Sequence, residues 1–432
     1  MLKKAIILCL DIICSLLIIP VFILQTIGLV IAVRARGGSR GNLLHISSAS
    51  STNKMLNKFG SFKALFDFDG NATEGVFDKV VLFWFPSENS LRYDFDNGWV
   101  VLEQRKVLGR LPLTGLLVFW LRLFRILVTE EISIVRGWDA YLSGFSALII
   151  NVLFGIPYCV SVHADFDKLH ELDPINGAPK ILSSRKIAKY LERQVLKNAD
   201  MVMPIRQYLA DKVITNGARP DSIRVIPHGI DMTPFKHVPK LDFYSHFNID
   251  KGRKIVSFVG RLSHDNYIYD VIEVARRLTD DVLMIIAGGG TEEAKVKSII
   301  EEDEALARKV MLLGFQNRET CFELRKISTV SLCLMGGLSL IEACAAGSPV
   351  IAYDVEWHSE LVKDGETGFL IQEHDTSKVS ELLEYLLQNP HEAKNMGNNA
   401  RELVFKTHDI SNTALIKRNH YIELKEKANN GG

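Results

Sequence analysis

The feature that most restricts the fold of this chain is a repeated alternation of short apolar segments with longer amphipathic ones. In the first half, apolar runs bounded by turn-forming residues predict strands at 42–50, 79–85, 132–137 and 157–165. Between the last two, residues 140–155 have the length and apolar spacing of a helix. Strands that alternate with helices favour a mostly parallel sheet covered by helices.

The same alternation returns in the second half. Four apolar runs, KIVSFVG, VLMIIAGGG, MLLGF and VSLCLM, alternate there with helix-like segments. Because 432 residues exceed what one ordinary core needs, we expect two doubly wound sheets. Their boundary should lie in 232–254, where the periodicity lapses and prolines and charges collect. Ligands of such sheets bind beyond the carboxyl ends of the strands, so two facing sheets predict a cleft.

Composition excludes some classes of function. Lys plus Arg and Asp plus Glu number 51 each, so no overall positive field favours nucleic acid. The six cysteines form no CxxC pair, and most lie in apolar runs where a free thiol packs as a small hydrophobic group. This usage indicates core cysteines in a reducing compartment.

The N-terminus carries a long apolar run from Ala5 to Val33, interrupted only by Asp11, Ser15, Gln25 and Thr26. Crossing a bilayer takes about 20 apolar residues, so the run is long enough for a membrane segment. A cleaved signal peptide is disfavoured because its apolar region is about 7–15 residues long.

How this segment meets the membrane stays open between two arrangements. Positive charge flanks both ends, which opposes a simple span under the positive-inside rule (Lys3, Lys4, Arg34, Arg36, Arg40). Pro20 divides the run near its middle, which favours a re-entrant hairpin, although proline also occurs in true spans. The stretch resembles the re-entrant anchor of monotopic phosphoglycosyl transferases in the order of its Lys, Asp, Ser and Pro residues. Either arrangement leaves the body on the cytosolic side.

A candidate anion site follows the run VSLCLM. Gly336 and Gly337 permit close backbone approach, and a helix is expected to begin at about Leu338. Free N–H groups at a helix N-terminus favour an anion, and phosphate is the natural occupant. Glu342, one turn in, can reach a hydroxyl beside that anion, and Arg261 at another strand end can grip a diphosphate. Alone, each pattern is also typical of an ordinary turn or a surface arginine.

The order of several motifs makes the interpretation specific. The motifs IPHGID, FVGRL, IIAGGG, LLGF, GLSLIEACAAGSPVIAYDVEWHSELV and DGETGFLI follow one another from residue 226. This order resembles glycosyltransferase family 4, and the resemblance covers residues from about 130 to 405. It implies retaining enzymes of the GT-B fold, with two Rossmann-like α/β domains facing a cleft and the nucleotide-sugar held mainly by the second.

The resemblance assigns roles to particular residues. Gly336, Gly337 and Leu338 would present backbone N–H groups to the donor diphosphate and sugar. Glu342 would contact the ribose, as the second glutamate of the family's E-x7-E motif. Arg261, after Gly260, would match the family's phosphate-binding arginine. Phe315 would lie beside the base, and His163 would match the first-domain histidine near the transferred sugar.

Two positions depart from the family pattern. Leu334 stands where the first glutamate of E-x7-E is expected, and Asn266 stands nearest to an expected lysine. Removing one electrostatic contact from such a site lowers the rate by about 10²–10³. A glycine-rich loop is also missing after the first strand. These departures leave three hypotheses open: an altered donor, compensation by residues such as His264 or Lys326, or a domain that no longer catalyses.

The predicted organisation is a membrane anchor at 1–36, an acceptor-side domain at 37–235, a nucleotide-sugar domain at 236–405, and a C-terminal helix at 406–432 that packs back on the first domain. The predicted function is hexosyl transfer from a nucleotide-sugar to a lipid-linked acceptor during surface glycan assembly. We expect neither a metal nor another cofactor, and we expect membrane attachment with the body on the cytosolic face.

Three alternatives depend on other patterns. A non-catalytic membrane scaffold would explain Leu334 and Asn266. A metal-dependent transferase would use an Asp-x-Asp pair such as Asp165 and Asp167, which follows a predicted strand. Residues 111–127 could form a helix that docks on anionic lipid, although such a helix more often packs on the sheet.

Overall fold

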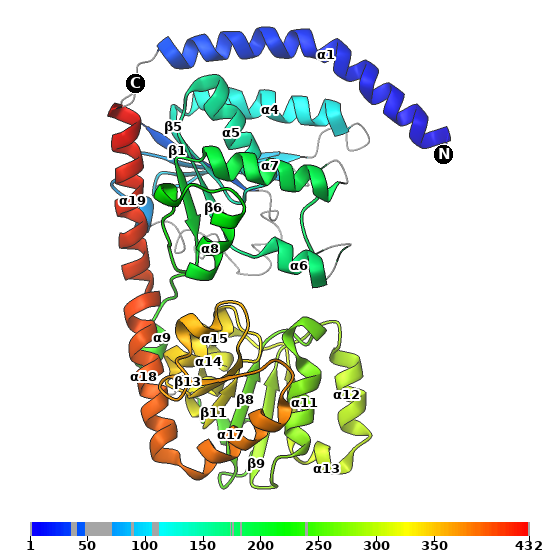
Figure 1. The fold of residues 1–432 in the computed structure, drawn as a ribbon, viewed down its shortest axis with the longest axis vertical. Coiled ribbons are helices and arrows are strands. Elements are labelled where there is room, and N and C mark those ends of the chain that lie inside the picture. The colour runs from blue at the N-terminus through cyan, green and yellow to red at the C-terminus, as the bar shows by residue number, and fades with distance from the viewer. Residues whose placement is uncertain are drawn as a thin grey trace. The chain divides into compact units, whose positions relative to one another are not determined.

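The protein consists of two compact units, which we describe separately (Figure 1). The N-terminal unit comprises Met1–Pro227 and Ala414–Gly432, and the C-terminal unit comprises His228–Thr413. The computed structural model describes residues 2–35, 41–47, 71–87, 90–105, 112–172, 174, 177–181, 184–237 and 241–430.

The N-terminal unit contains a seven-stranded sheet with the order β3-β4-β2-β1-β5-β6-β7. Its neighbours pair in parallel except β3, which runs antiparallel to β4 at one edge. The expected strands correspond to β1, β2, β5 and β6, whereas β3, β4 and β7 were not predicted. The bounds are β1 Asn42–Ser47, β2 Val80–Ser87, β3 Leu91–Asp94, β4 Trp99–Arg105, β5 Ile132–Gly137, β6 Tyr158–Val162 and β7 Met201–Pro204.

Hydrophobic clusters pack on this sheet. In α4, Leu123, Phe124 and Leu127 are fully buried in one cluster, which confirms that residues 112–127 form a helix packed on the sheet. Tyr421 and Leu424 of α19 belong to the other cluster. The helices are α4 Pro112–Thr129, α5 Leu142–Phe154, α6 Phe166–Leu172, α7 Arg185–Asn198, α8 Gln207–Thr215, the short η1 Pro220–Ser222 and the part of α19 (Ile410–Asn430) that follows Thr413.

The apolar N-terminus forms one helix, α1, from Leu2 to Ala35, with Pro20 inside it. Among the described residues it is the one helix long and apolar enough to cross a bilayer. Part of α1 packs against α4, and Phe22, Leu29, Val30 and Val33 contact the core of the unit. The helix is therefore attached to the folded body along its side.

The C-terminal unit contains a six-stranded sheet with the order β10-β9-β8-β11-β12-β13, in which every neighbouring pair is parallel. This is the doubly wound sheet that the alternation predicts. The strands are β8 Lys254–Val259, β9 Val282–Ala287, β10 Val310–Gly314, β11 Val330–Leu332, β12 Val350–Tyr353 and β13 Gly368–Ile371.

Helices connect and cover these strands. Asp, Asn and Asp side chains cap the N-termini of α13, α14 and α17, in the way expected for short polar residues before a helix. The bounds are α9 Thr233–Lys236, α10 Phe243–His246, η2 His264–Asn266, α11 Ile268–Arg276, α12 Glu293–Glu301, α13 Glu304–Ala307, α14 Arg318–Ile327, α15 Leu338–Ala346, α16 His358–Leu361, α17 Thr376–Gln388 and α18 Pro390–His408.

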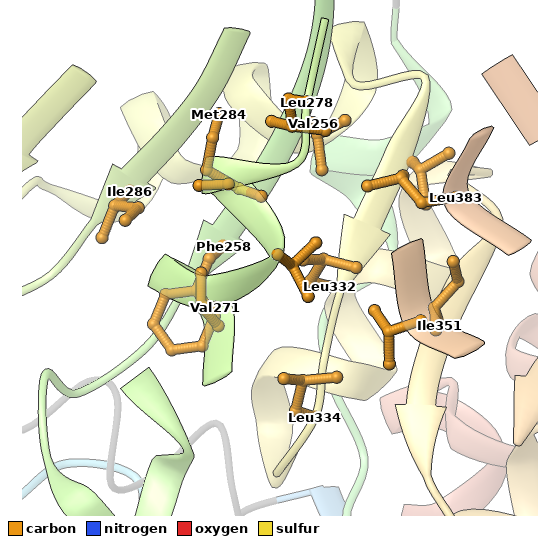
Figure 2. Close-up of a cluster of buried hydrophobic side chains, with 14 of the residues drawn as sticks. Val256, Phe258, Val271, Leu278, Met284, Ile286, Leu332, Leu334, Ile351 and Leu383 are labelled. Carbon is orange, nitrogen blue, oxygen red and sulfur yellow. The ribbon is translucent and has the colours of Figure 1, made fainter. Parts of the chain in front are cut away.

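The core on one face of this sheet joins strand residues to α11 and α17 (Figure 2). Phe258, Leu332 and Ile351 come from three adjacent strands, and Val271 and Leu383 come from the two helices. This packing fixes the positions of the strand ends and of the loops that follow them.

Candidate functional site

The strand order of the C-terminal unit creates a switch point between β8 and β11. From β8 the chain adds β9 and β10 on one side, then returns to add β11, β12 and β13 on the other. At such a point the loops at the carboxyl ends diverge and leave room for a ligand. Gly260 and Arg261 follow β8, and the Gly336–Gly337 turn lies between β11 and α15. The sequence-predicted residues of this unit therefore share one edge of the sheet.

The turn into α15 uses its two glycines differently. A Cβ atom on Gly336 would lie 2.6 Å from the Cβ of Leu340, so only glycine fits there without a shift. A Cβ on Gly337 would meet nothing within 4 Å. Gly337 is the N-cap residue of α15, and its lack of a side chain leaves the first turn without a side-chain cap. Gly337 and Leu338 are both exposed, so the start of α15 is at the surface of the unit.

One predicted donor contact differs from expectation. The N–H of Gly336 donates to Nε2 of His358 at 3.0 Å, so this amide is engaged inside the unit and does not face a diphosphate. Of the three residues predicted to contact the diphosphate through backbone N–H groups, Gly337 and Leu338 remain candidates. His358 is fully buried, and its Nδ1 lies 2.7 Å from the carbonyl oxygen of Tyr353. Because Nε2 accepts a hydrogen bond, the ring proton lies on Nδ1.

His358 was missed by sequence reasoning, although it lies within the quoted motif VEWHSELV. It is the first residue of α16, which follows β12 after a short turn, and its two ring nitrogens link the end of that strand to the glycine turn. A histidine in a motif carries no signal about which backbone group it contacts. Its partner Gly336 is distant in sequence, so periodicity could not reveal the bond.

A hydrogen-bonded chain links the first turn of α15 to the end of β8. The Ser339 hydroxyl donates to the carbonyl oxygen of Val259, and it accepts a bond from Nη2 of Arg325 at 3.2 Å. Nη1 of Arg325 lies 2.9 Å from a carboxylate oxygen of Glu342. We call these residues the Ser339 network: Val259, Ser339, Arg325 and Glu342. It holds the α15 entrance beside the Gly260–Arg261 loop.

Glu342 lies one turn into α15, as predicted, but its carboxylate already has protein partners. Besides buried Arg325, Arg318 approaches it at 3.5 Å from the exposed start of α14. Arg325 was not predicted as a site residue. The signal that could have found it is an arginine on the buried face of α14, next to Phe322 and Leu324.

The loop after β8 holds the other predicted donor residues. The side chain of Arg261 is 72 % exposed and forms an ion pair with Asp265 at 3.0 Å. Asn266 donates to the carbonyl oxygen of Arg261 at 3.1 Å, so it supports the backbone where the family has a lysine. The N–H of Gly260 donates to Ala287 in β9. Phe315, after β10, is 87 % exposed and presents an uncovered ring.

In the N-terminal unit, aromatic and basic side chains collect at the carboxyl ends of β1, β5 and β6. The His163 ring stacks on Trp138 with centroids 4.4 Å apart, and Trp138 stacks on His45 at 5.3 Å. Arg136 lies over Trp138 and donates to the Ser161 hydroxyl at 2.9 Å. His163, the predicted histidine, therefore sits at one end of a stack that the sequence did not reveal.

This cluster is electrostatically unusual. Burial, followed by the positive charges of Arg136 and Lys417, holds the pKa of His45 well below its ordinary value. Burial also lowers the pKa of Lys417 to about 7. Tyr421 of α19 accepts a hydrogen bond from Arg136 at 3.1 Å. The C-terminal helix thus completes the cluster from the far end of the chain.

Comparison with known proteins decides the identity of this arrangement. The family model described as "Glycosyltransferase Family 4" matches residues 78–233, and "Glycosyl transferases group 1" matches residues 243–403. The chain belongs to glycosyltransferase family 4. The first match covers the N-terminal sheet except β1, the second covers the whole C-terminal sheet, and the resemblance to family 4 is confirmed.

Curated relatives of this family 4 glycosyltransferase include an α-maltose-1-phosphate synthase of Mycolicibacterium smegmatis. It is 25 % identical over 295 residues, which cover 63 % of this chain and 74 % of the relative. A D-inositol 3-phosphate glycosyltransferase of Nocardia farcinica is 29 % identical over 220 residues, or 48 % of this chain. The match to that relative spans about half of its length, 49 %.

Solved structures show that this family 4 glycosyltransferase has the GT-B fold. Sucrose-phosphate synthase of Thermosynechococcus elongatus superposes with a TM-score of 0.70 at 18 % identity, over 89 % of this chain and 99 % of that one. The HepE protein of Anabaena, solved with UDP-glucose, gives a TM-score of 0.66 at 15 % identity, over 88 % and 99 %. The fold class predicted from the motifs is confirmed.

The family pattern also gives meaning to Leu334. Its side chain is fully buried in the core cluster, where Figure 2 shows it below Leu332. The position that should supply a donor-contacting glutamate therefore supplies packing instead. An ionised carboxylate could not occupy that apolar environment without a partner, so the departure is structural as well as chemical.

The aspartates of the metal-dependent alternative have protein partners. Asp165 accepts from the amides of Asp167 and Lys168, both at 3.0 Å, and so caps α6. Asp167 pairs with Arg185 and Lys189, and these contacts lower the pKa of its carboxyl despite partial burial. Another Asp-x-Asp pair, Asp67 and Asp69, lies outside the described residues.

Proposed function

We propose that this glycosyltransferase binds the diphosphate of a nucleotide-sugar where Gly337 and Leu338 open α15, with Arg261 beside it. The observation that carries the proposal is the hydrogen bond from Ser339 to Val259, because it fastens the helix entrance to the end of β8. Two sources of positive potential, a helix N-terminus and a guanidinium, then follow adjacent strands. The UDP-glucose bound to HepE supports a nucleotide-sugar as the donor class.

The proposed reaction is retaining transfer of a hexosyl group without a protein nucleophile. As the glycosidic bond to the diphosphate breaks, negative charge develops on the leaving group. The α15 amides and Arg261 stabilise that charge, while the acceptor hydroxyl attacks the same face of the sugar and passes its proton to the leaving phosphate oxygen. We expect the exposed ring of Phe315 to pack on the base. We expect the carboxylate of Glu342 to contact the ribose while it also contacts Arg325. We expect no metal, because fixed amides and a guanidinium supply the positive charge.

The acceptor side of the proposal rests on α1. A helix that is long and apolar enough for a membrane favours a lipid-linked acceptor presented at the bilayer surface. We therefore propose action at the cytosolic face of a cell membrane, in the assembly of a surface glycan. His163 and its stacked neighbour Trp138 are the residues we expect near the transferred sugar.

The test is to incubate purified full-length protein with a panel of nucleotide-sugars and to measure released nucleotide. Release from at least one donor is expected, and Arg261→Ala should lower it by about 10²–10³. Arg277→Ala is the matched control, since Arg277 also forms an ion pair with a carboxylate four residues away but lies after α11. Equal loss in both variants would contradict the proposed role of Arg261.

A second candidate is a non-catalytic membrane scaffold, which the burial of Leu334 favours. Isothermal titration with UDP and GDP separates the candidates: a scaffold without a nucleotide site binds neither. Adding EDTA to the transfer assay addresses the metal-dependent alternative. Activity that survives EDTA supports the amide and arginine site, and activity lost with EDTA and restored by Mg²⁺ or Mn²⁺ contradicts it.

A further inference from the structure

Three polar residues of the apolar helix α1, Asp11, Ser15 and Gln25, form hydrogen bonds with the folded body. The Asp11 carboxylate accepts hydrogen bonds from the backbone N–H groups of Leu113 and Thr114, at 2.9 and 3.0 Å, and from the Thr114 hydroxyl at 2.8 Å. These amides belong to the first turn of α4, so Asp11 caps that helix from another part of the chain. Asp11 is fully buried.

Further contacts extend this junction along α1. The Ser15 and Thr114 hydroxyls lie 3.0 Å apart, and Arg125 donates to Gln25 at 3.1 Å. The Phe22 ring lies 6.1 Å from that of Phe124. From residue 11 to residue 25, a helix rises about 21 Å, so the contact runs along the helix and is not a single crossing. Leu123 and Leu127 of α4 belong to the hydrophobic core on the sheet, so α4 lies between α1 and that core.

The opposite face of α1 is apolar and uncovered. Its residues are exposed over most of the helix length, and Leu17 and Leu24 are more than 70 % exposed. A soluble protein rarely leaves such a continuous apolar surface in water. The exposed members are Leu10, Ile12, Ile13, Leu16, Leu17, Ile19, Val21, Ile23, Leu24, Ile27 and Ile31.

We propose that α1 lies flat in one leaflet of an anionic bilayer, with its apolar face in lipid and its polar face sealed by α4. A perpendicular span would either pull α4 and the adjoining sheet into the hydrocarbon or break the bonds of Asp11 inside it. A lipid surface fits because lysines precede the apolar run and arginines follow it, so both ends can meet anionic headgroups on one side. This inference deepens the proposed membrane attachment and does not depend on the transfer reaction.

The first experiment traps the α1–α4 contact in membranes. Full-length protein with Cys9 and Cys14 changed to Ser would carry Ser15→Cys and Thr114→Cys, and would be oxidised in vesicles that contain anionic lipid. A disulfide joins Cβ atoms about 3.5–4.5 Å apart, and the two hydroxyl oxygens of this pair lie 3.0 Å apart. We expect loss of both introduced thiols to maleimide after denaturation. The control pairs Leu17→Cys with Thr114→Cys, and it should keep its thiols because Leu17 is on the lipid face.

A second experiment locates both ends and the depth of α1 without relying on the disulfide. In protein whose accessible native cysteines Cys9, Cys14 and Cys321 are changed to Ser, the variants Lys3→Cys and Ala35→Cys should both react with a membrane-impermeant maleimide from the same face. A spin label at Leu17→Cys should lie about 5–10 Å below the headgroup boundary, the depth of an interfacial helix. Labelling from opposite faces would establish a span and overturn the proposal.

The remaining outcomes of these experiments also test the proposal that α1 lies flat in one leaflet. Both ends on one face without the Ser15–Thr114 disulfide, together with a spin label near the bilayer centre, would establish a re-entrant hairpin and overturn the proposal. A disulfide between chains, or a dimer that fails to bind vesicles, would assign the apolar face to a second copy. Nucleotide release can be measured on the same preparations, so failure of this inference and failure of the proposed function are distinguishable.

Discussion

The carboxyl ends of the two sheets present different kinds of chemical groups. In the C-terminal unit the candidate site consists of glycine turns, backbone amides and a helix N-terminus, held in place by Ser339 and His358. In the N-terminal unit the same edge carries a stack of His45, Trp138 and His163 with Arg136 beside it. One edge thus offers fixed dipoles to a ligand, and the other offers side chains.

The difference between the two edges fits separate sites for donor and acceptor binding. Backbone amides suit the diphosphate, which all nucleotide-sugars share, whereas side chains are the means by which different acceptors are recognised. Substitutions in the C-terminal unit should therefore change UDP binding. Substitutions in the N-terminal stack should change transfer and leave UDP binding as it is.

The largest expected effect is in the Ser339 network. Arg325→Ala leaves Glu342 partly buried without its close partner, and we expect a loss of about 3–5 kcal/mol in the free energy of unfolding. Arg318→Ala is the matched control, because its exposed side chain lies 3.5 Å from the same carboxylate and should contribute at most about 1 kcal/mol. Urea unfolding followed by circular dichroism measures both. Similar losses in the two variants would mean that burial does not govern this ion pair.

The next effect separates the two glycines. Gly336→Ala forces a Cβ against Leu340, so it should cost about 1–3 kcal/mol and weaken UDP binding by displacing the α15 entrance. Gly337→Ala has room for its Cβ and should leave the melting temperature within error. Its added methyl borders the proposed diphosphate position, so UDP affinity should still fall. Thermal unfolding with and without UDP measures both quantities, and a stable Gly336→Ala protein would contradict the packing argument.

The surroundings of Arg325 and of the two glycines also show what the sequence could and could not predict. The helix entrance, its position after β11 and the residues Gly337 and Glu342 followed from local pattern, because a strand, a tight turn and a helix are each encoded by neighbouring residues. The contact of His358 with Gly336 and that of Arg325 with Glu342 join segments distant in sequence, which no periodicity reports. Without the motif order, even the glycine turn would have been indistinguishable from an ordinary one.

The N-terminal stack illustrates the same limit more strongly. His163 was identified only through the motif resemblance, and His45, Trp138 and Lys417 were not identified at all, because β1, β5 and α19 meet only in the folded unit. The strand pair β3 and β4 escaped prediction for a different reason: the segment 91–105 mixes charged and apolar residues, and β3 is the edge strand of the sheet. Parallel central strands, which are continuously apolar, were the easier elements.

A third prediction tests the bond that joins the α15 entrance to β8. Ser339→Ala removes one hydrogen bond to Val259 and one from Arg325, and each is worth about 0.5–1.5 kcal/mol. Because the entrance would then shift relative to Arg261, the rate of nucleotide release should fall by a larger factor than the stability loss alone would explain. Ser348→Ala is the control, since Ser348 is also buried and hydrogen-bonded but contacts Ser331 inside the sheet. If both variants lower release equally, the Ser339 network has no special role in positioning the donor.

The smallest stability effect is expected in the N-terminal stack, where the readout is activity. Trp138→Phe keeps an aromatic ring between His45 and His163 but reduces the overlap, so the loss should stay below about 1.5 kcal/mol. UDP affinity, measured by titration calorimetry, should equal that of the unchanged protein, because the proposed diphosphate contacts belong to the other sheet. Transfer to acceptor should fall, since the stack positions His163. A Trp138→Phe protein that loses UDP binding while its fold is retained would show that the two edges do not divide donor and acceptor binding in this way.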